Sequence, residues 1–335
     1  MLGLTSRLGV LGLVLAASFV VGTLDERRGR RSAVVLESPV HVQGLRAEVS
    51  SPAAGEFSAG VIALREWALL SAQARTRNKV PLAGRQHGLA RLMALQDQRT
   101  GRMGPPTDDA LEHILGTIAL CEALRIEDVR FRRAAAQAAL DHLFVLRQAD
   151  GRWASVRTQH ATEWALVAAV LGQRAGLQID RPAVDRALKV VEADLVQWAR
   201  TPTSEGATKD GWAAPFAALS LWDVSFLDSG IGGLLRSLLP RLTDAVPLHG
   251  SVEQPVSLET PFWTTLGLAQ LGGSALVRWE ARFPREFFTG LAGTPASWQT
   301  DRLQGLFDTP TDAHALAVLV ECVYYRTDTG LLGDG

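Results

Sequence analysis

Hydrophobic and polar positions divide residues 56–327 into two kinds of segment that follow each other along the chain. One kind has an apolar stripe and a polar face, as in residues 130–147 and 182–200. The other is apolar on nearly every side, as in residues 161–176, ATEWALVAAVLGQRAG. Apolar positions at three- and four-residue spacing predict helices, and a helix that is apolar all round must be buried on both sides. We therefore expect amphipathic outer helices packed around apolar inner helices.

The same order continues through the whole segment. Each predicted hairpin is an outer helix followed by an inner helix, and stacked hairpins of this kind curl into a solenoid or close into a toroid. Counting one helix at 56–77 and the amphipathic helix that begins the segment 89–104, eleven helices are expected, one short of six pairs. The other predicted outer helices cover residues 231–243 and 275–291, and the other inner helices cover 110–124, 213–224, 258–273 and 312–325.

The turns between outer and inner helices repeat at a spacing of about fifty residues. LARLMALQDQRTGRMG at 89–104 matches LDHLFVLRQADGRW at 140–153, so that Gly101 and Gly151 lie fifty positions apart. Glycine ends a helix by adopting a left-handed backbone, and an aromatic residue two positions later is placed to pack between hairpins. We interpret these positions as structural: Gly101, Gln148, Gly151, Trp153, Gly211, Trp212 and Trp298.

The turn QADGRW at 148–153, with the helix before it, resembles the QW repeat of the squalene-cyclase and prenyltransferase superfamily. Residues 111–227 are especially similar to uncharacterised bacterial members, and the resemblance weakens in the last two repeats. It implies an all-α fold, an (α/α) toroid or curled solenoid of five to six hairpins with a central cavity. It implies chemistry only where the catalytic motifs of the family are present.

Those catalytic motifs are mostly absent. The DXDD motif of class II terpene cyclases has its nearest match at 106–109, PTDD, where proline replaces the first acidic residue and Asp108 aligns with the proton donor. Asp108, Asp109 and Glu112 also resemble a lone DDxxE magnesium motif of class I enzymes. The competing interpretation is that Thr107 or Asp108 caps the next helix, since acidic residues favour a helix N-terminus.

The prenyltransferase zinc site is also not matched. In that family the zinc ligands include an aspartate two positions before a cysteine, whereas Cys121 follows Ala119 and Cys322 follows Val320 at this spacing. Two cysteines in apolar segments exclude a disulfide framework and a cysteine-rich zinc site. No metal and no cofactor are predicted.

Polar residues gather at the predicted starts of the inner helices, where a toroid exposes side chains to its central hollow. Such a set of carboxylates and imidazoles is suited to a cation, a polar ligand or a peptide. The alternative is ordinary helix capping for the acids and backbone hydrogen bonding for the histidines. Beyond Asp109 and Glu112, the candidates are His113, His160, Glu163, Asp210, Glu259, Asp312 and His314.

The first 24 residues contain the uncharged run LGVLGLVLAASFVVGTL at 8–24, preceded by Arg7. Seventeen helical residues span about 26 Å, slightly less than a hydrocarbon core of about 30 Å. The segment is therefore a single transmembrane anchor or a signal peptide. Basic residues that follow it hinder export and favour the anchor. The basic residues after the run are Arg27, Arg28, Arg30 and Arg31, and together with Arg7 before it they flank the membrane segment.

These patterns give a domain plan and a location. The plan is an anchor or signal peptide at 1–24, a basic extended linker at 25–55, a helical domain at 56–327 and a tail at 328–335. We expect a single-pass protein of the bacterial inner membrane, with the side of the helical domain left open. With 34 basic and 35 acidic residues, the near-neutral charge argues against a nucleic-acid partner.

Three functions compete on this basis. The first is a non-catalytic, membrane-tethered toroid that binds membrane lipid through its first helix and a protein partner as an accessory subunit. The second is a terpenoid- or prenyl-processing enzyme with Asp108 as acid. The third is a carbohydrate-active toroid with paired carboxylates.

Overall fold

The computed structural model describes residues 58–75, 86–105, 109–200, 211–223, 230, 232–234, 256–282, 303–307 and 309–324. Contacts divide the chain into two units, Met1–Pro39 and Val40–Gly335, and every described residue belongs to the second. The predicted anchor, linker and tail lie outside the described residues. Among the helices that are described, none combines the length and the hydropathy needed to cross a membrane.

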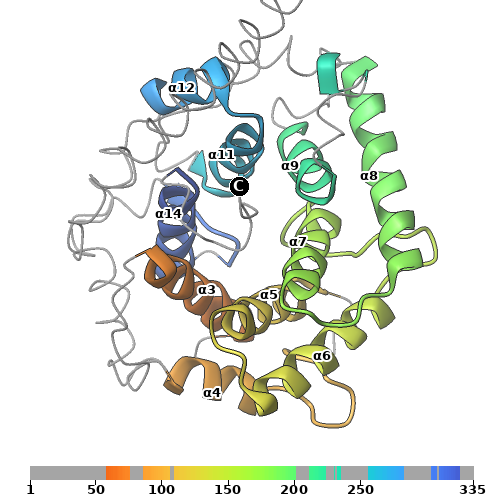
Figure 1. The fold of residues 1–335 in the computed structure, drawn as a ribbon, viewed down its shortest axis with the longest axis vertical. Helices are drawn as coiled ribbons and strands as arrows, with labels where there is room; N and C mark the ends of the chain where they lie inside the picture. The colour runs from red at the N-terminus through yellow and green to blue at the C-terminus, as the bar shows by residue number, and fades with distance from the viewer. Residues whose placement is uncertain are drawn as a thin grey trace, which may run out of the picture. The chain divides into compact units, whose positions relative to one another are not determined.

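The described chain is helical, which confirms the predicted all-α class (Figure 1). Its secondary structure outside helices is one short parallel pair, β1 (Val256–Ser257) with β2 (Leu303–Gln304), which the sequence pattern did not indicate. The inner helices are α3 (Ala59–Arg75), α5 (Leu111–Ile126), α7 (Ala161–Arg174), α9 (Ala213–Trp222), α11 (Glu259–Leu271) and α14 (Pro310–Tyr324). The outer helices are α4 (Gln86–Ala94), α6 (Arg130–Val145), α8 (Arg181–Arg200) and α12 (Gly273–Arg282).

The contacts among the inner helices are cyclic. Each of α3, α5, α7, α9, α11 and α14 packs against the next, and α14 packs against α3. We call these six helices the inner ring, and Figure 1 shows α4, α6, α8 and α12 outside it. The outer helices α4, α6 and α8 each contact the two inner helices that they connect.

Burial differs between the two kinds of helix as the periodicity predicts. In α5, every residue from Leu111 to Leu124 is buried, so this helix has no solvent face. In α8, buried residues recur every three or four positions and form one stripe. That stripe consists of Ala183, Val184, Ala187, Val191, Leu195 and Trp198.

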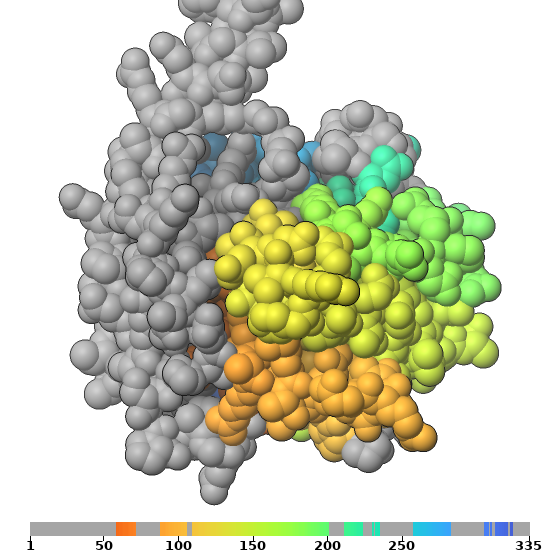
Figure 2. All heavy atoms as spheres, turned by 60° about the horizontal axis from the view of Figure 1, so that its bottom comes forward, coloured from red at the N-terminus to blue at the C-terminus, as the bar shows by residue number. Residues whose placement is uncertain are grey.

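The repeated turns pack against the next outer helix along the chain. Gly101 and Gly151 both have positive φ, 80° and 98°. A Cβ on Gly101 would overlap the backbone of Ala138 in α6, and Gly151 faces Val190 in α8. In Figure 2 the segment that contains Gly101 (orange) lies directly beside the yellow segment that contains α6. Gly101 therefore lets its turn approach the following hairpin closely, and both glycines supply the left-handed backbone of the turns.

Side chains then fix each turn in place. Trp153 is buried, and its indole N–H donates to the Leu143 carbonyl at 2.7 Å, while its backbone N–H donates to Thr162 Oγ1. Arg152 makes a bidentate ion pair with Asp194 of α8, at 2.6 and 2.7 Å. In the weaker repeat, Gly211 precedes a fully buried Trp212. Backbone bonds also close this turn: the Gln148 carbonyl accepts from the Gly151 N–H, and the Gln148 backbone N–H donates to the Arg152 carbonyl.

Candidate functional site

The first turns of several inner helices meet at one end of the inner ring, which we call the ring end. Direct contacts connect the start of α5 with the α6–α7 turn, that turn with α11, and the same turn with the segment before α14. Inner helices are alternate elements of a hairpin repeat, so their N-termini point the same way. The ring-end residues are Asp109, Arg157, Thr158, His160, Glu163, Glu259, Phe307 and Asp312.

Glu259, in the first turn of α11, accepts hydrogen bonds from side chains of two inner helices and of the α6–α7 turn. Its Oε1 accepts hydrogen bonds from Thr158 Oγ1 at 2.7 Å, Trp164 Nε1 at 2.7 Å and Trp263 Nε1 at 3.3 Å. All three donors are neutral, so they orient the carboxylate and leave its charge in place. Glu259 therefore joins α7 to α11 and presents a negative charge at the ring end.

His160 and Glu163 form a second group beside it. His160 Nδ1 lies 3.9 Å from Glu163 Oε1, and the His160 ring stands edge-on to Trp263 at 6.4 Å between ring centroids. Both side chains are largely buried, with exposed fractions of 13% and 7%. The structure thus brings the predicted residues His160, Glu163 and Glu259 to one place.

Asp109 and Arg157 form a third group. Asp109 Oδ1 accepts from the Leu111 N–H at 3.0 Å, so Asp109, directly before the N-cap Ala110, satisfies the first backbone N–H of α5. Its Oδ2 lies 3.5 Å from Arg157 Nε, and the Arg157 guanidinium lies 5.0 Å from the centre of the Phe307 ring. The carboxylate of Asp109 is therefore engaged in capping and in an ion pair.

Asp312 is fully buried in a capping box at the start of α14. Its carboxylate accepts from Phe307 N–H at 2.6 Å, Thr309 N–H at 2.8 Å and Thr309 Oγ1 at 2.6 Å, and Thr309 Oγ1 accepts from Asp312 N–H in return. Burial raises the pKa of Asp312, against the opposing effect of these hydrogen bonds. The carboxylate therefore stabilises the start of α14 and the segment before it.

His113 lies within the helical wall instead of at the ring end. Its Nδ1 accepts from the Met103 N–H at 3.0 Å, and its Nε2 donates to the Ala139 carbonyl at 2.9 Å, which fixes a neutral imidazole. Burial, and next the nearby His142, lower the pKa of His113 to about 3. It satisfies two backbone groups and joins the α4–α5 turn and α5 to α6.

The other predicted residues are separate from the ring-end groups or lie outside the described part of the chain. Glu112 is buried in the first turn of α5 against Gly104, and its Oε2 has no hydrogen-bond partner among described residues. His314 is buried in α14. The predicted residues that lie outside the described part are Arg7, Arg27, Arg28, Arg30, Arg31, Asp108, Asp210 and Trp298.

Aromatic side chains fill the middle of the inner ring. Trp67 of α3, Trp164 of α7, and Phe262 and Trp263 of α11 are each at most 1% exposed. The Trp67 ring is edge-on to Trp164 at 6.0 Å and to Phe262 at 5.9 Å, and Trp164 stacks on Phe262 at 5.0 Å. A side chain beside a cavity large enough for water has accessible surface. Since these four side chains have almost none, no such cavity borders them. We call these four residues the aromatic interior.

The aromatic interior is not among the site residues predicted from the sequence, although the sequence contains a signal for it. The tetrapeptide Glu-Trp-Ala-Leu occurs at 66–69 and again at 163–166, and Trp263 follows about one hundred residues later. This is a spacing of two hairpins, so the three tryptophans come from alternate helices of the inner ring. Arg157, Thr158 and Phe307 were also missed, because turn residues carry no periodic signal.

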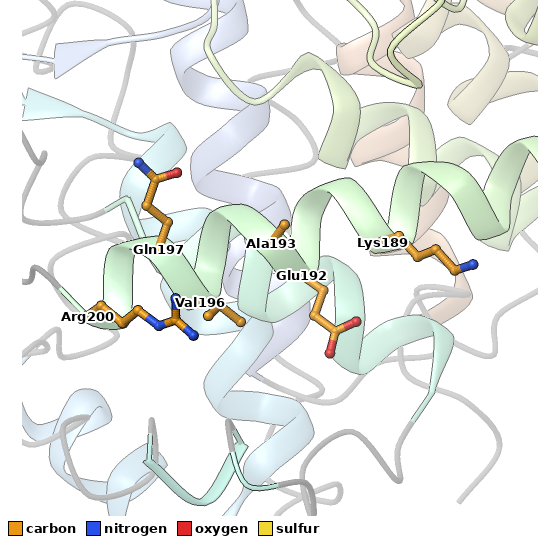
Figure 3. Close-up of a pocket in the computed structure, with 6 residues that line it drawn as sticks. All are labelled: Lys189, Glu192, Ala193, Val196, Gln197 and Arg200. Atoms are coloured by element: carbon orange, nitrogen blue, oxygen red, sulfur yellow. The ribbon is translucent and has the colours of Figure 1, made fainter.

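Two open hollows lie on the outer side of the described helices. One of about 700 Å³ runs along α8, where Lys189, Glu192, Gln197 and Arg200 project in different directions (Figure 3). A second, of about 400 Å³, lies between the end of α6 and the α7–α8 turn. The first is lined by scattered exposed side chains and holds no converging set of reactive groups, so we place the candidate site at the ring end. Within the described part of the chain, no three His, Cys, Asp or Glu side chains are placed to hold a metal.

No family model, no curated protein and no solved structure matches this chain. The candidate site therefore rests on its own geometry.

Proposed function

We propose that this protein is a non-catalytic (α/α) toroid, tethered to a membrane by its N-terminal segment, that binds a protein partner as an accessory subunit of a membrane assembly. The observation that carries the proposal is the aromatic interior. An enzyme for an apolar isoprenoid needs a cavity whose walls are accessible to the substrate. Trp67, Trp164, Phe262 and Trp263 instead pack against one another, which suits a scaffold better than a reaction chamber.

The cyclic helix contacts support the toroid. Six inner helices contact each other in order and α14 returns to α3, and the outer helices α4, α6 and α8 each contact two successive inner helices. The QADGRW turn at 148–153 supports a relationship to the squalene-cyclase and prenyltransferase superfamily. In this proposal the chain retains the scaffold of that superfamily and uses it for binding.

The partner contact in this proposal is the ring end, and the segment bound there is basic with an apolar side chain beside the charge. Glu259 is half-buried and supplies the negative charge, and its hydrogen bonds come from neutral donors. Val156 in the same α6–α7 turn is 92% exposed, which supplies an apolar contact. An apolar contact beside a fixed charge is the usual composition of a specific interface.

The proposal is tested by purifying the full chain from its native membranes in mild detergent, followed by cross-linking and mass spectrometry. A reproducible partner cross-linked near the α6–α7 turn is expected. Val156→Lys is expected to reduce recovery of that partner at least about tenfold, a cost over about 1.4 kcal/mol, because it removes the apolar contact and places a like charge against the basic segment. Val145→Lys is the matched control, since Val145 is also exposed, at 73%, and lies at the end of α6.

Two results would reject the proposal: a lone monomer after solubilisation, or equal losses for the two valine variants. Conversion of polyprenyl diphosphates or squalene-like substrates by the purified protein would favour the enzyme instead. No described contact favours that alternative, because Asp108 lies outside the described residues and Asp109 is engaged with Leu111 and Arg157.

A further inference from the structure

The contact between α14 and α3 differs from the other contacts of the inner ring, because no short chain connection joins these two helices. Helices α3 and α5 are joined through α4, α5 and α7 through α6, and α7 and α9 through α8. Helices α3 and α14 are the first and last of the ring in chain order. The ring can therefore part between them without stretching a connection, and only non-covalent contacts oppose this.

Phe307 spans this α14–α3 contact. It lies five residues before Asp312 of α14, is 8% exposed, and its ring packs directly on Gly60 of α3. A Cβ at Gly60 would overlap the ring, so the absence of a side chain there makes the seat for Phe307. On the outside, the Arg157 guanidinium covers the same ring at 5.0 Å.

The segment that carries Phe307 is fastened to α14 and to the rest of the ring end. The buried carboxylate of Asp312 accepts the Phe307 N–H at 2.6 Å, and Gly305 packs against that carboxylate with no room for a Cβ. At its other end, β2 pairs with β1, directly before α11. The segment 303–307 therefore moves with α14 and α11, while its aromatic ring is seated on α3.

We propose that residues 303–307 form a strap that closes the inner ring between α14 and α3, and that the ring opens at this place when Phe307 leaves its seat on Gly60. Opening there separates the two helices that chain connectivity does not hold together. It gives access to the aromatic interior from the side of α3, where Trp67 lies. The proposal concerns a motion of the fold and does not depend on which partner the ring end binds.

Two buried cysteines report on this motion in the full-length protein. Cys322 lies in α14 and Cys121 lies in α5, on a part of the ring where both neighbours are joined to it by the chain. Both are protected from a thiol reagent in the closed ring, and burial raises the pKa of the Cys121 thiol. Global unfolding exposes both thiols, whereas opening between α14 and α3 is expected to expose Cys322, which lies in a helix at the opening, and to leave Cys121 buried.

The experiment compares the rates at which 5,5′-dithiobis(2-nitrobenzoate) labels the two thiols under native conditions, with peptide mapping to assign each. Phe307→Ala is expected to raise the Cys322 rate at least about tenfold and to leave the Cys121 rate within about twofold, since local opening does not require global unfolding. Phe131→Ala, which removes an exposed phenylalanine from α6, is the control and is expected to change neither rate.

A second variant covers the case in which Phe307→Ala does not fold. Gly60→Ala leaves the strap intact and adds one methyl group beneath the Phe307 ring. It is expected to give the same selective rise at Cys322. Equal acceleration of both cysteines, or no acceleration at Cys322 in a folded variant, would overturn the strap.

Discussion

The aromatic interior and the ring end are built from the same helices but are stabilised by different interactions. In the interior, the buried rings of Trp67, Trp164 and Phe262 contact each other, and the energy comes from burial of apolar area. At the ring end, one turn closer to the N-termini of α7 and α11, carboxylates and hydroxyls are fixed by hydrogen bonds. Glu259 connects the two regions, because it binds the indole N–H groups of Trp164 and Trp263.

This difference indicates how the chain separates stability from recognition. The interior is closed and its side chains have no accessible surface, so substitutions there act on folding. The ring end carries fixed charges and the exposed Val156, so substitutions there can act on binding while the fold persists. Four measurements test this separation.

The largest effect is expected for Trp164→Ala in the aromatic interior. The side chain is fully buried and contacts Trp67, Phe262 and Trp263. Its loss is expected to reduce the free energy of unfolding by about 4 kcal/mol, because it removes buried area and leaves a cavity. Chemical denaturation measures this. Val156→Ala, at an exposed ring-end position, is the control and is expected to stay within about 0.5 kcal/mol of the unaltered protein; similar losses for both would remove the distinction.

The next effect is expected at Glu259, where the two regions join. Glu259→Ala leaves the donors of Trp164, Trp263 and Thr158 without their shared acceptor, and we expect a loss of about 3 kcal/mol. Glu259→Gln keeps a carbonyl oxygen as acceptor and is expected to cost about 1 kcal/mol. Denaturation midpoints of the two variants measure the difference. If Gln is as damaging as Ala, the charge itself, and not hydrogen-bond acceptance, holds the indoles.

A pH-dependent effect is expected for His113 in the helical wall. Its folded pKa of about 3 lies below the usual value of 6.5, so the unfolded chain takes up a proton more readily. The stability that neutral His113 contributes is therefore complete above pH 6.5 and is lost as pH falls toward 3. His113→Gln is expected to cost about 2 kcal/mol at pH 7 and less at pH 4, measured by denaturation at both values. A cost that is independent of pH would show that titration of this imidazole does not contribute.

The smallest effect is expected for Arg157→Ala at the ring end. Arg157 is 41% exposed and its ion pair with Asp109 spans 3.5 Å, so solvent screens the attraction. We expect a loss of about 0.5 kcal/mol in thermal or chemical unfolding. A loss above about 2 kcal/mol would mean that the ring end contributes as much to stability as parts of the interior do.

The sequence predicted the helices well and the site only in part. Predicted inner segments such as 110–124 and 161–176 agree with α5 and α7 to within about two residues, because helix periodicity is local. Among the candidate residues, His160, Glu163 and Glu259 come together, whereas His113 is occupied by backbone groups of the wall. Sequence alone does not separate these cases, since the helix phase that turns a histidine inward or toward a neighbouring turn depends on packing.

What the sequence by itself determined is the hairpin unit: an amphipathic helix, a turn with a left-handed glycine and a helix apolar on all sides. These features arise from hydrogen bonds and burial within about fifty residues. Only the tertiary structure decided that α14 returns to α3, that Trp67, Trp164 and Trp263 meet, and that Phe307 seats on Gly60. The reason is that small rotations between successive hairpins add up around the ring, and contacts between residues about one hundred or more positions apart depend on that sum.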